Sequence, residues 1–236
     1  MNRLSVPPDA PDAQTRARLA DGSFVKTLRA DPPPGVRLRT DAELHATLDE
    51  VLRDHDPCDD VSVFGYGSLM WNPAIDFVDA RIGRVIGWHR RFCLRSVLGR
   101  GSPELPGVML ALDRGGACRG LLFRIEAAKV RAELELLWQR EMVSGSYDAR
   151  WVCARIGAER VQTLAFVINR SHERYIAERA PEHVASLILT GRGALGTSRD
   201  YFDSTRRALR QHGIRDPGIE RLHLALLEAA EEQASA

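Results

Sequence analysis

The chain has few of the residues that build metal sites and disulfide frameworks. Its 236 residues include four cysteines and seven histidines, with no Cys-x-x-Cys or His-Glu-x-x-His pattern. Because metal ligands usually recur at such short spacings, we expect no metal site. Sparse, well-separated cysteines are typical of a reducing compartment. These cysteines are Cys58, Cys93, Cys118 and Cys153.

The chain also has no excess of charge and no long apolar run. Lys and Arg number 33 against 32 Asp and Glu, so the net charge is +1. This balance gives no reason to expect nucleic acid or an anionic membrane as a partner. No run approaches the length of a membrane span, and the N-terminus lacks the apolar segment of a secretory signal. We therefore expect a soluble, cytoplasmic protein, and its oligomeric state stays open.

The first part of the chain is predicted to be an extension. Residues 1–39 carry two proline clusters and only one short apolar segment, 24–28, which indicates little core of their own. We expect them to be dispensable for chemistry. Next, Thr40-x-x-Glu43 has the pattern of a capping box and begins an amphipathic helix that ends near Pro57.

The remaining sequence, which makes up most of the chain, predicts one α+β domain. Apolar residues amount to 44%, enough for a substantial core. Strand patterns begin at residue 61, one helix interrupts them, and helices follow residue 169. This order favours a small mixed, barrel-like sheet with an inserted helix and flanking helices. We divide the chain into an extension, 1–58, and a domain, 59–236. The strand candidates are 61–64, 84–96, 107–112, 118–125, 150–156 and 160–168, and the clearest late helices are 198–212 and 217–233.

One glutamate lies where a helix should carry an apolar residue. Residues 126–142 have good helix formers, no Gly or Pro, and apolar side chains at helical spacing. At about 100° per residue, Glu141 projects into the middle of that apolar stripe, whereas Glu133 and Glu135 are expected to point to solvent. A buried carboxylate is costly unless it is paired, and burial also tunes a general base. Two alternatives are that the helix frays before Glu141 or that a buried arginine pairs with it structurally.

A glycine-rich turn follows the first predicted strand. Gly65 and Gly67 enclose Tyr66, and Ser68 comes next. Two glycines let the backbone turn sharply and let a ligand approach, and successive N–H groups there can hold a carboxylate or an oxyanion. The alternative is a tight turn that only closes the sheet. Ser68 is not expected to be a nucleophile, because the Gly-x-Ser-x-Gly pattern is absent.

Two further segments are weaker candidates. Residues 191–196 match Gly-x-Gly-x-x-Gly, but a helix pattern precedes them and no βαβ unit follows, so we interpret them as a loop rather than a dinucleotide site. Arg192 and Arg199 there are available to an anion. Residues 100–107 form a Pro- and Gly-rich loop between strands. Arg95, just before it, is either solvated or able to reach a substrate.

Five segments occur in the order found in a known family. They read VFGYGSLMWNP, GWHRRFCLR, RGSPELPG, LLWQREMVSGSY and GALGTSRDYF. Together they resemble the ChaC-type γ-glutamylcyclotransferases, specifically the glutathione-specific branch. The resemblance runs from Val61 nearly to the C-terminus, and the short helix-containing extension is similar to that of bacterial members. It implies a small α+β barrel, no cofactor, and cleavage of the small molecule glutathione into 5-oxoproline and Cys-Gly.

The resemblance also implies roles for individual residues. The catalytic glutamate of the family's Arg-Glu motif falls on Glu141, and the substrate loop falls on residues 64–69. The candidate site is therefore catalytic Glu141 with substrate-binding Phe64, Gly65, Tyr66, Gly67, Ser68, Leu69, Arg95, Tyr147 and Tyr201. A cyclotransferase for other γ-glutamyl amines and a non-catalytic γ-glutamyl-binding protein are the alternatives.

Overall fold

The structure is a computed structural model that describes residues 15–33 and 35–235, with side chains as far as residue 232. The first part of the predicted extension, residues 1–14, lies outside the described residues.

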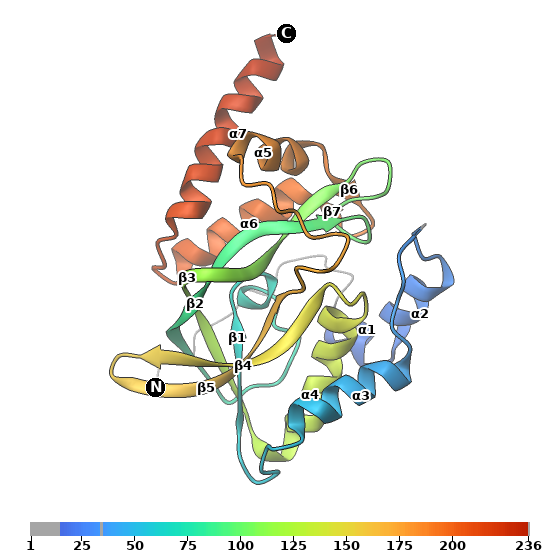
Figure 1. The fold of residues 1–236 in the computed structure, drawn as a ribbon, viewed down its shortest axis with the longest axis vertical. Helices are drawn as coiled ribbons and strands as arrows, with labels where there is room; N and C mark the ends of the chain where they lie inside the picture. The colour runs from blue at the N-terminus through green and yellow to red at the C-terminus, as the bar shows by residue number, and fades with distance from the viewer. Residues whose placement is uncertain (1–14, 34, 236) are drawn as a thin grey trace.

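Five strands form a closed barrel at the centre of the molecule (Figure 1). Neighbouring strands are mostly antiparallel, and a parallel contact between Val63 and Leu164 closes the ring from the first strand to the last. The predicted α+β class with a mixed barrel is confirmed. The strands are β1 (Val61–Gly65), β2 (Asp79–Ser96), β3 (Gly107–Ile125), β4 (Tyr147–Ile156) and β5 (Glu159–Ile168), in the order β1-β3-β2-β4-β5.

The longest strand corrects one sequence-based prediction. Residues 107–112 and 118–125, predicted as two strands, belong to the single strand β3. Gly115 and Gly116, which suggested a break, have φ of +100° and +66° and let the strand bend while it continues. Opposite them, β2 shifts its register around Gly87, which has φ of +86°. Such bulges increase local twist, which allows the long β2–β3 hairpin to curl into a barrel.

The helices form two groups around the barrel (Figure 1). Near one end lie α5 (Pro181–Thr190), α6 (Ser198–Gln211) and α7 (Pro217–Ser235), and the last two confirm the predicted helices. The glycine-rich segment after α5 forms a two-stranded hairpin of β6 (Arg192–Gly193) and β7 (Gly196–Thr197). A helix rather than a strand therefore precedes it, as the sequence indicated.

The second group contains two predicted helices, one before and one after the glycine turn in the sequence. Helix α3 (Asp41–Leu52) begins with the expected capping box between Thr40 and Glu43. Helix α4 (Val130–Leu137) follows the short turn η2 (Ala127–Lys129) and continues as a π-helical turn, η3 (Trp138–Met142). Glu141 lies in that turn.

The extension packs on α4. This contact shows that the predicted exposure of Glu133 was wrong. Glu133, expected to point to solvent, is 2% exposed, because Arg16 of α1 (Arg16–Ala20) covers it and pairs with it. Leu19 of α1 and side chains of α2 (Ser23–Ala30) form a small apolar cluster with α4. The cluster consists of Leu19, Phe24, Val25, Leu136 and Val143.

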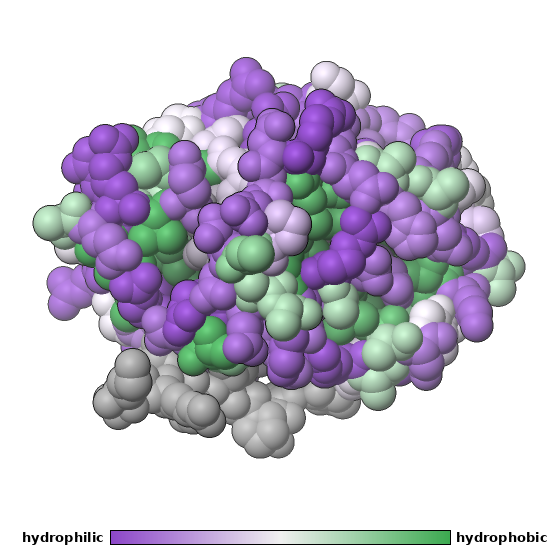
Figure 2. Space-filling model, turned by 90° about the horizontal axis from the view of Figure 1, so that it is seen from below, coloured by the Kyte–Doolittle hydropathy of each residue, from purple (hydrophilic) through white to green (hydrophobic). Residues whose placement is uncertain are grey.

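The face of the molecule shown in Figure 2 is mainly hydrophilic. Seen from below the view of Figure 1, it shows polar side chains with small, separated hydrophobic patches (Figure 2). None of the helices within the described residues is both long and apolar enough to cross a membrane.

Candidate active site

Six separate segments meet at one pocket beside the barrel. They are the turn after β1, the start of β3, the π-helical turn, the first residue of β4, the end of β5 and the start of α6. The residues that line it are Tyr66, Gly67, Ser68, Leu69, Met109, Leu110, Glu141, Tyr147, Phe166 and Tyr201. The pocket encloses about 20 Å³, close to the space of one water molecule. Met109, which is long and partly exposed, forms part of its wall.

Glu141 is the acid of this pocket. The helix neither frays before it nor continues as an α-helix, because Trp138–Met142 form the wider π turn, a feature frequent at functional sites. Its side chain is 14% exposed. Burial raises the pKa of the Glu141 carboxyl above the ordinary value of 4.5, and the charge of Arg140 opposes this only in part. A carboxylate whose pKa is raised is a stronger base than a free glutamate.

Arg140 is the charged neighbour of this carboxyl. Its side chain is 1% exposed, and Nε lies 3.1 Å from Oε1 of Glu141. The pair lacks hydrogen-bond geometry, because Nε and Nη2 of Arg140 have no hydrogen-bond partner. Nη1 donates to the carbonyl of Asn72 at 2.6 Å. The buried arginine that the sequence analysis considered as a partner of Glu141 is therefore present. Arg140 forms no hydrogen bond with the carboxylate, whose oxygens stay accessible to a ligand.

Three buried tyrosines surround Glu141. The Tyr66 hydroxyl donates to the carbonyl of Phe166 at 2.8 Å, and that of Tyr147 donates to the carbonyl of Leu110 at 2.7 Å. Tyr201 packs edge-on against Trp71. Burial first, and then nearby charge, raises the pKa of all three hydroxyls. They therefore stay protonated and supply neutral hydroxyl groups.

Steric contact fixes the glycines of the turn. Gly67 has φ of −132°, outside the left-handed region, so its side-chain-free Cα rather than its backbone angle is what the turn requires. A Cβ on Gly67 would lie 3.1 Å from the Tyr201 hydroxyl, at the pocket. A Cβ on Gly65 would lie 2.7 Å from Cε2 of Phe123, in the core. The short helix η1 (Ser68–Met70) then leads the chain away.

Most of the predicted site residues come together, and three do not line the pocket. Phe64 is fully buried in the barrel core, and Gly65 is held against Phe123. The Arg95 side chain is exposed on β2 and is not among the lining residues. Arg199 pairs with Asp203 on its own helix. From the loop 100–107, Arg100 lies over the Tyr201 ring at 5.9 Å.

Sequence reasoning missed the apolar walls of the pocket. Met109, Leu110 and Phe166 carry no group that marks chemistry, and they reach the pocket only because the closed barrel places β3 and β5 beside the turn after β1. A strand pattern could mark such residues as buried but not as pocket walls. Among the described residues, no three His, Cys, Asp or Glu side chains are grouped so that they could hold a metal ion.

A family model described as ChaC-like protein matches residues 61–230, which is most of the chain and includes every pocket residue. The chain belongs to the ChaC-like protein family. The match begins at β1, so residues 16–39 with α1 and α2 lie outside it.

The ChaC-like domain has relatives in bacteria and animals. It is 40% identical over 163 residues to a glutathione-specific gamma-glutamylcyclotransferase of Escherichia coli, covering 69% of this chain and 71% of the relative. It is 33% identical over 145 residues to glutathione-specific gamma-glutamylcyclotransferase 1 of Homo sapiens, covering 59% of this chain and 65% of the relative.

A crystal structure from yeast shares the fold. It is a gamma-glutamyl cyclotransferase specific to glutathione, and it superposes with a TM-score of 0.66 at 18% identity. The superposition covers 72% of this ChaC-like chain and 96% of the yeast chain. At this identity the likeness supports the fold assignment alone.

Proposed function

We propose that this protein is a glutathione-specific γ-glutamylcyclotransferase that releases 5-oxoproline and Cys-Gly. The observation that carries the proposal is Glu141, a buried carboxyl with a raised pKa that faces a pocket of neutral tyrosines and the glycine turn. The family and the named relatives support the substrate.

The reaction is an internal aminolysis. The α-amine of the γ-glutamyl group attacks its own γ-carbonyl carbon, a C–N bond closes the five-membered lactam, and the C–N bond to Cys-Gly breaks. Because the α-amine is largely protonated near neutral pH, it needs a base before it can attack. Glu141 accepts that proton and returns it to the leaving nitrogen.

The rest of the pocket orients the substrate. Folding the γ-glutamyl chain so that the amine meets the carbonyl supplies a proximity contribution, which can reach several kcal/mol for well-oriented groups. The N–H groups of the turn from Tyr66 to Leu69 hold either the substrate α-carboxylate or the tetrahedral oxyanion. The hydroxyls of Tyr66 and Tyr147 already donate to backbone carbonyls, so toward a substrate their oxygens are neutral acceptors that do not compete with Glu141 for protons.

No covalent enzyme intermediate is needed. Cys93, a thiol on β2, is fully buried, and burial raises its pKa to about 12. It therefore stays a thiol at neutral pH and is a poor nucleophile. All four cysteines are free, which fits a small-molecule enzyme of the reducing cytoplasm.

The decisive experiment is an assay of the pure protein with glutathione, in which 5-oxoproline and Cys-Gly are both quantified. Equal amounts of the two products support the proposal. Parallel reactions with γ-glutamyl-alanine and other γ-glutamyl amines test the alternative substrate class. Binding of glutathione without product formation would instead indicate a γ-glutamyl-binding protein.

A further inference from the structure

The segment outside the family match contacts both ends of the helix that carries Glu141. At the N-terminal end, Arg16 Nη1 and Nη2 lie 2.5 and 2.6 Å from the two carboxylate oxygens of Glu133 on α4. The Glu133 side chain is 3% exposed, and its other donor is the backbone N–H of Asp76 at 2.9 Å. A buried carboxylate of this kind depends on its charged partner.

Arg16 also reaches the loop that holds Arg140. Its Nη1 donates to the carbonyl of Ala74 at 3.4 Å, and two residues earlier the carbonyl of Asn72 accepts from Arg140. Ala74 has φ of +54°, which alanine rarely adopts, so the neighbouring contacts determine the path of this loop. The extension therefore holds the loop against which Arg140 is fixed.

At the C-terminal end, Arg39 ties down the π turn itself. Its Nη1 donates to the carbonyl of Met142 at 3.0 Å, and its backbone N–H donates to the carbonyl of Val143 at 2.7 Å. Met142 follows Glu141 directly. The Met142 carbonyl, which has no partner within the helix, also accepts from the backbone N–H of Gly145 at 3.1 Å, so Arg39 supplies a second donor that links this carbonyl to the extension. Arg29 of α2 fixes Arg39 in turn by donating to its carbonyl at 2.7 Å.

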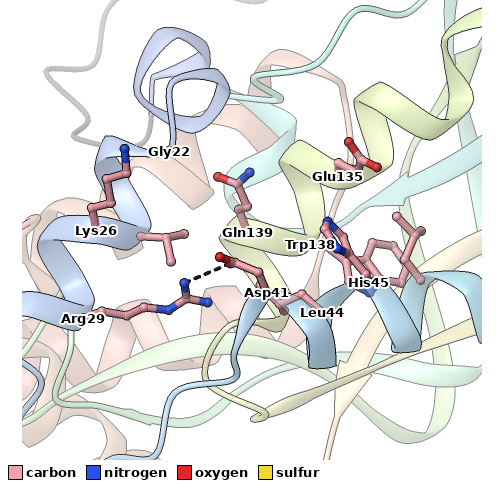
Figure 3. Close-up of a pocket in the computed structure, with 11 residues that line it drawn as sticks. Gly22, Lys26, Arg29, Asp41, Leu44, His45, Glu135, Trp138 and Gln139 are labelled. Carbon is pink, nitrogen blue, oxygen red and sulfur yellow. Dashed lines mark ion pairs between the residues drawn. The ribbon is translucent and has the colours of Figure 1, made fainter.

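Between these two ends the extension and the helix do not pack tightly. A cavity of about 190 Å³ separates α2 and α3 from the π turn (Figure 3). Gln139 points into it, and its Oε1 atom is buried without a hydrogen-bond partner. Arg29 and Asp41 form an ion pair across it at 2.9 Å. Beside the cavity, Trp138 Nε1 of the π turn donates to Thr47 Oγ1 of α3 at 3.0 Å, so this bond, the polar contacts at the two ends and the apolar cluster together form the connection.

We propose that Arg39 and Arg16 are positioning residues that hold the π turn, and with it Glu141, in its working orientation. The inference rests on the proposed cyclotransferase function for its kinetic readout. It replaces the expectation that residues 1–39 are dispensable for chemistry. A misplacement of about 1 Å can lower a rate by about 100-fold, so loss of these contacts acts on kcat.

The test compares Arg39→Met with Arg37→Met in the full-length chain. Methionine keeps the apolar stem of arginine and removes its donors. Arg37 lies two residues away and is exposed, and it pairs with Glu43 at the surface, so it controls for the loss of one charge. We expect Arg39→Met to lower kcat by about 10- to 100-fold with KM within about threefold of the parent. Arg39→Lys should recover part of the loss, and Arg37→Met should match the parent.

A second arm tests the other end without relying on Arg39. Arg16→Met leaves Glu133 buried without its charged partner and should lower both the thermal midpoint and kcat. Adding Glu133→Gln removes the uncompensated charge and keeps an acceptor for the Asp76 N–H, so the double variant should regain most of the thermal midpoint, while kcat stays low because the contacts of Arg16 are still missing. Parental kcat in both Arg39→Met and Arg16→Met would overturn the inference. So would a lower thermal midpoint with unchanged kcat per folded molecule.

Hydrogen–deuterium exchange separates this inference from the proposed function. Peptides covering residues 138–147 should exchange faster in Arg39→Met than in the parent, and at the parental rate in Arg37→Met. If the parent forms no 5-oxoproline, the proposed function fails, and exchange still judges whether Arg39 holds the π turn. Unchanged exchange of these peptides in Arg39→Met contradicts the positioning role.

Discussion

The Arg140 guanidinium lies 3.1 Å from the Glu141 carboxylate, its neighbour in the sequence, and yet does not lower the pKa of that carboxyl below the ordinary value. Burial disfavours the charged carboxylate by more than the arginine favours it. Arg140 is itself held by the carbonyl of Asn72 and does not form a hydrogen bond with Glu141. The result is a carboxyl near a positive charge that still binds a proton more tightly than a free glutamate.

This balance predicts how activity depends on pH. The base form of Glu141 is the unprotonated one, so kcat/KM should fall on the acid side with a midpoint above pH 4.5, the ordinary value for the group. A pH profile of 5-oxoproline formation from glutathione measures this midpoint. An acid limb at or below pH 4.5 would show that Glu141 is not the titrating base.

The same shift has a consequence for stability. A carboxyl with a raised folded-state pKa favours the folded state below its unfolded pKa, and this contribution is lost as pH rises through the folded-state pKa. Relative to Glu141→Gln, the parent should therefore become less stable as the pH rises above 4.5. Urea unfolding of both proteins across this pH range provides the comparison, and a constant difference would contradict the raised pKa.

Replacing the two glycines of the turn by alanine should have different effects, one mainly on activity and the other mainly on stability. In Gly67→Ala, the new Cβ contacts the Tyr201 hydroxyl at 3.1 Å inside the pocket, so kcat/KM should fall while the thermal midpoint changes little. In Gly65→Ala, the Cβ meets Phe123 at 2.7 Å in the core, so stability should fall, by about 1–3 kcal/mol for an overpacked site. Full activity in Gly67→Ala would remove this turn from the mechanism.

The substrate amine provides a test that leaves the protein unchanged. N-Acetyl-glutathione keeps the scissile amide but lacks a nucleophilic amine, so it should release no Cys-Gly. A mechanism in which water attacks the γ-carbonyl tolerates the acetyl group. Release of Cys-Gly from the acetylated peptide at a rate near that from glutathione would therefore exclude cyclisation.

The fold and the centre of the site could be predicted from local patterns. Helical spacing marked Glu141 as an acid on a buried face, and Gly65 and Gly67 marked the turn beside which it lies. Tyr147 and Tyr201, assigned by resemblance, both line the pocket. Glu141 and the turn follow from short stretches of sequence in which propensity and spacing decide the structure, whereas the two tyrosines rest on the family resemblance.

The remaining features depend on contacts between distant residues. Glu133 has an exposed pattern in its own helix, and only the approach of Arg16, 117 residues earlier, makes it buried. The π turn at Glu141 has no residue signature, and its outside donor, Arg39, comes from beyond the matched domain. Arg95 was a candidate because of its charge, but β2 leaves its side chain at the surface.

Replacing Glu141 by glutamine decides between a catalytic base and a structural ion pair. Glutamine keeps the size and much of the hydrogen bonding of glutamate but cannot accept the amine proton. If Glu141 is the base, kcat should fall by at least the ~100-fold typical of lost acid–base catalysis, while glutathione still binds through the unaltered turn. The thermal midpoint should not fall, because Arg140 keeps its bond to Asn72 and a carboxyl that resists ionisation is removed.

If the pair of Glu141 with Arg140 is instead structural, the thermal midpoint drops and the protein that remains folded stays active. Thermal unfolding and 5-oxoproline formation, measured on the same preparation, distinguish these outcomes, and an active but destabilised variant rejects Glu141 as the base.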